Sequence, residues 1–120
     1  MGKAHSIIIK CIANSPITFV SNLPKNKFTD VLGYQLIKSG TSIGANYRVA
    51  TSAESHDDFI YKIGIVEKEV SETQYWLELM RESSIGNLDE LQSLLQECSE
   101  LCAIFTATGK TAKSNRNKKQ

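Results

Sequence analysis

The chain has 120 residues, of which 41% are hydrophobic and 22% charged, and its formal net charge is +1. This composition is typical of one globular domain large enough to bury a core, and it excludes a chain that is disordered throughout. No apolar run approaches the roughly 18 residues of a membrane span, so we expect a cytoplasmic protein with no membrane partner. The cysteines are Cys11, Cys98 and Cys102. We expect them to pack in the core without a disulfide.

The small net charge conceals an uneven distribution. Residues 1–53 carry six Lys/Arg and one acid, whereas residues 54–107 carry three Lys/Arg and twelve acids. The last thirteen residues add five cations and no acid. The chain is therefore a charge dipole with a basic C-terminal end.

A broken helical pattern opens the chain. Apolar residues recur at near-helical spacing over residues 5–23, but Pro16 falls among them. Proline lacks a backbone N–H and clashes with the preceding helical turn. We expect a first helix that is kinked or split near Pro16, followed by a turn at residues 23–26.

Residues 27–50 are predicted to form a second helix whose centre is rich in small residues. Gly40 and Gly44 stand four positions apart, and each costs roughly 1 kcal/mol relative to Ala inside a helix. The close approach of another helix would offset that cost. We therefore predict a helix-packing seam at Ser39, Gly40, Ile43 and Gly44. A helix that breaks at Gly40 is the alternative.

Residues 55–58 form a capping sequence that is predicted to start a third helix. Its apolar positions alternate at four and three residues over three heptads, the period of helices packed nearly parallel in a bundle. These positions are Phe59, Ile63, Val66, Val70, Thr73, Leu77 and Met80. The opposite, Glu-rich face lacks the paired Glu-x-x-His ligands of di-iron bundles. We interpret it as a solvated face without a metal.

A capping-box-like start at residues 87–90 predicts a fourth helix, whose apolar arc is wider than one neighbour requires. On the third helix, Tyr75 and Trp76 are adjacent and point about 100° apart, so at most one of them can face the core. Both features predict a homo-oligomer interface that includes Tyr75, Trp76, Leu94 and Leu101. A partly exposed aromatic residue on a monomer is the alternative.

Residues 108–120 contain five cations, no acid and no large apolar residue, so we predict a disordered basic tail. The predicted fold is all-α. We expect an up-down-up-down antiparallel four-helix bundle over residues 1–107, followed by the tail at residues 108–120.

No motif for catalysis or cofactor binding occurs. Gly109, Lys110 and Thr111 resemble the end of a phosphate-binding loop, but that motif requires a glycine where Ile104 stands. His56 lies at a helix start, where a role near the cap is favoured over catalysis. We therefore predict that the protein is not an enzyme and binds no cofactor or metal.

Four stretches resemble a known family, the four-helix-bundle proteins encoded within intervening sequences of bacterial 23S rRNA genes. The stretches are residues 35–46, 58–62, 68–79 and 97–101. The resemblance covers roughly residues 30–102, whereas the first helix matches poorly. Val49 stands where the family usually has an acid.

The resemblance implies an up-down-up-down bundle whose relatives assemble into ring-shaped pentamers. It also implies kinship with an accessory protein of diversity-generating retroelements, which binds nucleic acid and a reverse transcriptase through a basic surface. We therefore expect an oligomeric, non-enzymatic protein, pentameric by resemblance, that binds structured RNA or DNA or a ribonucleoprotein partner such as a reverse transcriptase. The candidate nucleic-acid-binding residues are Lys25, Lys27, Lys38 and Arg48. A protein-protein interaction scaffold with no nucleic-acid role is the alternative.

Overall fold

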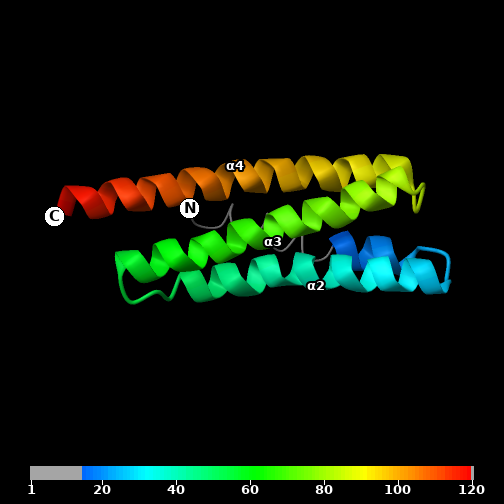
Figure 1. The fold of residues 1–120 in the computed structure, drawn as a ribbon, viewed down its shortest axis with the longest axis horizontal. Coiled ribbons are helices and arrows are strands. Elements are labelled where there is room, and N and C mark those ends of the chain that lie inside the picture. The colour runs from blue at the N-terminus through cyan, green and yellow to red at the C-terminus, as the bar shows by residue number, and fades with distance from the viewer. Residues whose placement is uncertain (1–14, 120) are drawn as a thin grey trace.

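The computed structural model describes residues 15–119, which are helical except for short connections (Figure 1). A helical segment over residues 15–21 precedes α2 (Lys27–Ala50), α3 (His56–Glu82) and α4 (Leu88–Lys119). No strand occurs within residues 15–119, so the all-α prediction is confirmed. The arrangement is consistent with a four-helix bundle. The course of the first helix on the N-terminal side of Ser15, and with it the expected kink or split near Pro16, lies outside the described residues.

Side-chain caps define where the three long helices begin. Asn26, Ser55 and Asn87 each accept a hydrogen bond from the backbone N–H three residues further on, at 2.9, 3.1 and 3.0 Å. These bonds satisfy donors that have no partner inside the helix. The predicted starts of the second, third and fourth helices are therefore confirmed.

Helix α3 lies at the centre of the fold because it packs against both α2 and α4. Its predicted heptad positions from Ile63 to Met80 are at most 1% exposed. On α2, Leu36 and Ile43 are fully buried, and on α4 Phe105 is fully buried with its ring 5.5 Å from that of Tyr47. In the part of the chain that the structure describes, no helix has a stretch apolar and long enough to cross a membrane.

The small residues of α2 lie where other helices approach it. A β-carbon added at Gly40 would be 3.3 Å from Cγ of Pro16, and one added at Gly33 would be 2.8 Å from a methyl group of Val20. The segment 15–21 therefore lies directly on the α2 backbone. Helix α2 continues through Gly40, so the alternative of a break there is wrong.

Ser39 faces a different neighbour from Gly40. Its hydroxyl is hydrogen-bonded at 2.9 Å to that of Thr73 on α3, and both residues are buried. Ile43 is fully buried beside them, and Gly44 is half-buried. Ser39, Gly40 and Ile43 thus lie on the part of the α2 surface that other helices cover, whereas the packing role of Gly44 stays a prediction.

The C-terminal end differs from the prediction. Residues 108–119 are not a disordered tail, because α4 continues as a helix to Lys119. Gly109 and Ala112 are buried, and a β-carbon at Gly109 would lie 3.8 Å from a methyl group of Ile63. Small residues therefore pack this end of α4 against α3 without the bulky side chains that sequence patterns detect. Figure 1 shows α4 extending beyond the α2–α3 connection.

Candidate nucleic-acid interface

The predicted basic residues lie on or beside the outer face of α2. Lys27, Lys38 and Arg48 are exposed within α2, and Lys25 is exposed in the turn before it. At about 100° per residue, Lys27 and Lys38 point within about 20° of each other, and Arg48 points about 80° away from Lys38. All three lie roughly opposite the buried side of α2. At 1.5 Å per residue they span about 32 Å along the helix.

Large apolar side chains are interspersed among these cations. Phe28 and Tyr34 are each 63% exposed, Val31 is 56% exposed and Val49 is 52% exposed. Single exposed apolar residues are ordinary, but a row of them on one solvent-facing helix surface indicates a binding site. Helical periodicity did not identify this row, because periodicity marks the buried face of a helix and these residues lie off that face.

An acidic side chain on α3, that of Glu69, lies near Lys38, the central cation of the α2 face. Glu69 is close enough to Lys38 for the lysine charge to act on its carboxylate. Burial raises the pKa of Glu69, the neighbouring Glu72 raises it further, and Lys68 and Lys38 counteract both. The charge of Lys38 is therefore partly compensated within the molecule, which weakens its attraction for an external anion.

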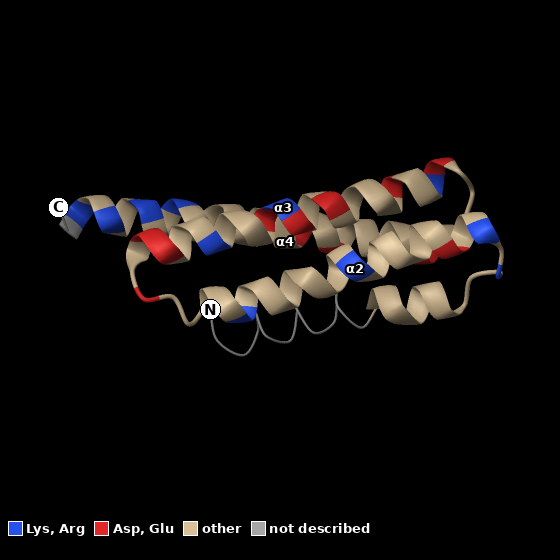
Figure 2. Cartoon of the chain, turned by 60° about the horizontal axis from the view of Figure 1, so that its bottom comes forward, with Lys and Arg blue, Asp and Glu red and all other residues tan. Residues whose placement is uncertain are grey.

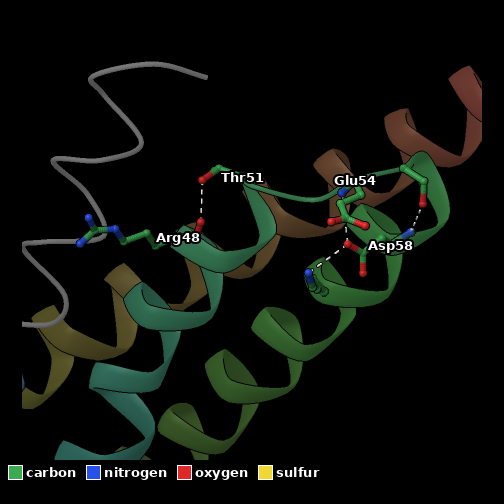
Figure 3. Close-up of polar contacts among 6 residues, drawn as sticks. Arg48, Thr51, Glu54 and Asp58 are labelled. Carbon is green, nitrogen blue, oxygen red and sulfur yellow. Dashed lines mark hydrogen bonds and ion pairs between the residues drawn. The ribbon is translucent and has the colours of Figure 1, made fainter.

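The α2–α3 connection is held by local hydrogen bonds (Figure 3). The Thr51 hydroxyl donates to the carbonyl of Arg48 at 2.7 Å, and the Arg48 side chain points away from α3. At the start of α3, Asp58 accepts hydrogen bonds from Lys62 at 2.9 Å and from the backbone N–H of Glu54 at 3.3 Å. These bonds lower the pKa of Asp58, with the Lys62 bond the main cause. The loop is thus pinned to α3, and the Arg48 side chain is exposed.

A second basic surface lies near the C-terminus of α4, where Figure 2 shows a cluster of cations. Lys110, Lys113 and Lys118 are exposed, and Arg116 makes an ion pair with Asp57 at 2.9 Å. These charges are evident in the sequence, but the composition around them predicted a disordered tail. The missed signal was the small residues Gly109 and Ala112, which allow close helix packing without an apolar stripe.

The predicted oligomer interface is only partly exposed. Tyr75 is 55% exposed and meets the half-buried Trp76 edge to face, with ring centroids 4.9 Å apart. The indole N–H of Trp76 is buried and has no hydrogen-bond partner among residues 15–119. Leu94 and Leu101 are 5% and 0% exposed, so their assignment to an interface is wrong. Leu94 and Leu101 belong to the buried face of α4. The residues that widen the apolar face of α4 beyond the core are Leu95 and Ile104, which are half-buried.

The cysteines and the histidine within residues 15–119 lie in three different settings. Cys98 is buried, and burial raises its pKa to about 12, which keeps the thiol protonated and unreactive. Cys102 is exposed, so the expectation that it packs in the core is wrong. His56 and Phe59 line a groove of about 560 Å³ whose α4 side is formed by three apolar and three polar residues, namely Ile104, Ala107, Ala112, Thr108, Thr111 and Asn115. Within residues 15–119, no group of three or more His, Cys, Asp or Glu side chains is arranged to hold a metal ion.

Comparisons with known proteins agree with the resemblance seen in the sequence. The family model described as "23S rRNA-intervening sequence protein" matches residues 11–107. A crystal structure of a protein of unknown function from the S23 ribosomal protein family of Bacteroides thetaiotaomicron VPI-5482 is 31% identical. The match covers 88% of this chain and 97% of that one, with a TM-score of 0.81. No curated protein matches. The chain therefore belongs to the 23S rRNA-intervening sequence protein family.

Proposed function

We propose that this protein is a non-enzymatic, oligomeric binding protein for structured RNA or DNA, either free or within a ribonucleoprotein such as a reverse transcriptase complex. The observation that carries the proposal is the outer face of α2, where exposed Phe28, Val31 and Tyr34 lie among exposed cations. Cations contact phosphates, whereas aromatic side chains stack on unpaired bases in loops and bulges. Such a face suits a folded nucleic acid that has both a charged backbone and exposed bases.

The proposal includes an assembly. We infer an up-down-up-down bundle that forms a ring, with five copies as in the relatives that the resemblance implies, and kinship with the retroelement accessory protein. Its cellular location is then the cytoplasm, with its nucleic-acid partner. One α2 face supplies only three or four phosphate contacts, and Glu69 opposes the central lysine. Repetition of the face around a ring raises the overall affinity by effective concentration.

Binding is tested by measuring the affinity for an RNA hairpin over a series of salt concentrations. The variant Lys27→Gln/Lys38→Gln/Arg48→Gln should bind more weakly, and the slope of log affinity against log salt should fall in magnitude by about 0.7 to 0.9 for each phosphate that is no longer neutralised. The matched control Lys62→Gln/Lys68→Gln/Arg81→Gln removes the same charge from α3. Equal effects of the two variants would show that net charge, and not the α2 face, governs binding.

A protein-protein scaffold is the second candidate function, and the exposed apolar row on α2 together with Tyr75 favours it. Aromatic residues are enriched in protein interfaces. Light scattering should give a multiple of the 13.3 kDa chain mass, and Trp76→Ala should lower that multiple. A stable oligomer that retains neither RNA nor DNA at low salt would favour the scaffold, whereas a monomer at tens of micromolar would exclude the ring.

A further inference from the structure

The C-terminal part of α4 presents cations from an ordered helix. No acid occurs in α4 after Glu100, and Lys110, Lys113 and Lys118 are exposed. At about 100° per residue the three lysines fall within an arc of about 140°. Gly109 and Arg116 lie outside that arc and face α3. The lysines therefore form one basic edge, directed away from the bundle, which we call the α4 edge.

Two contacts fix the orientation of this edge. Gly109 lies so close to α3 that a β-carbon there would be 3.3 Å from a carboxylate oxygen of Glu67. Further along, Arg116 makes its ion pair with Asp57, a residue 59 positions away in the sequence. Together these contacts hold the last turns of α4 in one rotational setting. Arg116 is occupied by this contact, so the three lysines remain as cations for an external ligand.

The α4 edge has a higher density of cations than the face of α2. Its three lysines span about 12 Å of helix, whereas Lys27, Lys38 and Arg48 span about 32 Å. Successive phosphates of one strand are about 3.4 Å apart along the axis of duplex DNA, so 12 Å corresponds to three or four phosphates. Acids of α3 lie near both surfaces: Glu69 is near Lys38, and Glu67 and Asp57 lie at Gly109 and Arg116, on the side of α4 that faces α3. The spacing of the lysines on the α4 edge therefore matches a nucleic-acid backbone more closely than the spacing of the α2 cations.

We propose that the α4 edge is a contact surface for the phosphate backbone of duplex nucleic acid, including the stems of structured RNA. The inference rests on the proposed function and assigns the duplex-binding part of it to a surface other than α2. Lysine ammonium groups bind phosphates as point charges without reading the sequence. The α4 edge accordingly supplies affinity and salt dependence, and base preference has to arise elsewhere.

The test compares full-length variants in binding to a fully paired RNA duplex and a fully paired DNA duplex. Lys110→Gln/Lys113→Gln/Lys118→Gln should lower affinity at least tenfold near 150 mM salt. On the DNA duplex it should reduce the magnitude of the salt slope by about 2.7, which is 0.9 for each phosphate contact. Lys→Arg at the same three positions should preserve the slope. Glutamine and lysine have similar helix propensities, so circular dichroism should show that the helix is retained.

Two outcomes separate the inference from the proposed function. If the wild-type protein binds and the α4 glutamine variant binds equally well, while the α2 glutamine variant is weakened, the α4 edge is not the contact surface and the proposed function stands. If the wild-type protein retains neither a duplex nor an RNA hairpin at low salt, the proposed function fails, and the inference fails with it. Loss of binding in the α4 variant but not in the α3 control Lys62→Gln/Lys68→Gln/Arg81→Gln supports the inference.

Discussion

The close contact between Gly40 and Pro16 makes a quantitative prediction about the replacement Gly40→Leu. Glycine is roughly 0.8 to 1 kcal/mol less favourable than alanine in a helix interior, and leucine ranks just below alanine, so an unhindered replacement should stabilise the protein by somewhat less than about 1 kcal/mol. At Gly40, however, even the first atom of the new side chain would lie 3.3 Å from the Pro16 ring, which is tighter than an ordinary van der Waals contact, and leucine adds three further carbons beyond it. Overpacking of this kind costs about 1 to 3 kcal/mol. The replacement should therefore range from near neutral to about 2 kcal/mol destabilising.

Gly64 provides the matched control, because it lies in α3 and a β-carbon there would meet nothing within 4 Å. Gly64→Leu should show the propensity gain alone. The two variants should then differ by about 1 to 3 kcal/mol in the free energy of unfolding, measured by urea denaturation at one protein concentration. For a domain of this size the difference corresponds to roughly 4 to 12 °C in Tm.

A double-mutant cycle identifies the contact responsible. Pro16→Ala removes the ring atom that the new side chain would meet, so Gly40→Leu should cost less in that background. The cost of Gly64→Leu should not change. If Gly40→Leu and Gly64→Leu stabilise the protein equally, or if Pro16→Ala leaves the effect of Gly40→Leu unchanged, the close approach of the segment 15–21 to α2 is refuted.

Three further predictions concern polar groups. Thr73→Val should cost about 1 kcal/mol in urea unfolding because Ser39 loses a buried partner, and adding Ser39→Ala should cost less than the sum of the two single changes. Burial, and to a lesser extent Glu100, raise the pKa of Glu97 in the folded protein above the ordinary value of 4.5. The ionised carboxylate therefore destabilises the fold fully at a pH above the raised pKa, and this destabilisation is absent at a pH below 4.5. Glu97→Gln should therefore raise Tm at pH 7 but not at pH 3, and an unchanged Tm at both would contradict this reasoning. The pKa of Asp58 is lowered in the folded protein, so the stability that its carboxylate supplies is present above the ordinary pKa of 3.8 and is lost as the pH falls through the lowered pKa. In thermal melts, the Tm of Asp58→Asn should therefore fall less than that of the wild type as the pH is lowered through this range.

Periodicity and caps in the sequence determined most of the fold. The heptad positions of α3 predicted its buried face, and Asn26, Ser55 and Asn87 mark where the long helices begin. These signals are readable because each depends on residues within a few positions of one another: an apolar stripe repeats with the helical turn, and a cap bonds three residues ahead. The spacing of Gly40 and Gly44 likewise indicated that another helix approaches α2.

The tertiary structure alone decided how surfaces are divided between core and solvent. Leu94 and Leu101 look like surplus apolar residues in the sequence, but the positions of α3 and the segment 15–21 relative to α4 determine that they are buried. The helical end of α4 depends on the packing of Gly109 near Ile63 and on the ion pair between Arg116 and Asp57. Glycine and charged residues have no apolar pattern, and their partners lie more than forty residues away. Local sequence therefore specified the helices, whereas long-range packing determined where the last one ends and which of its cations form an ordered edge.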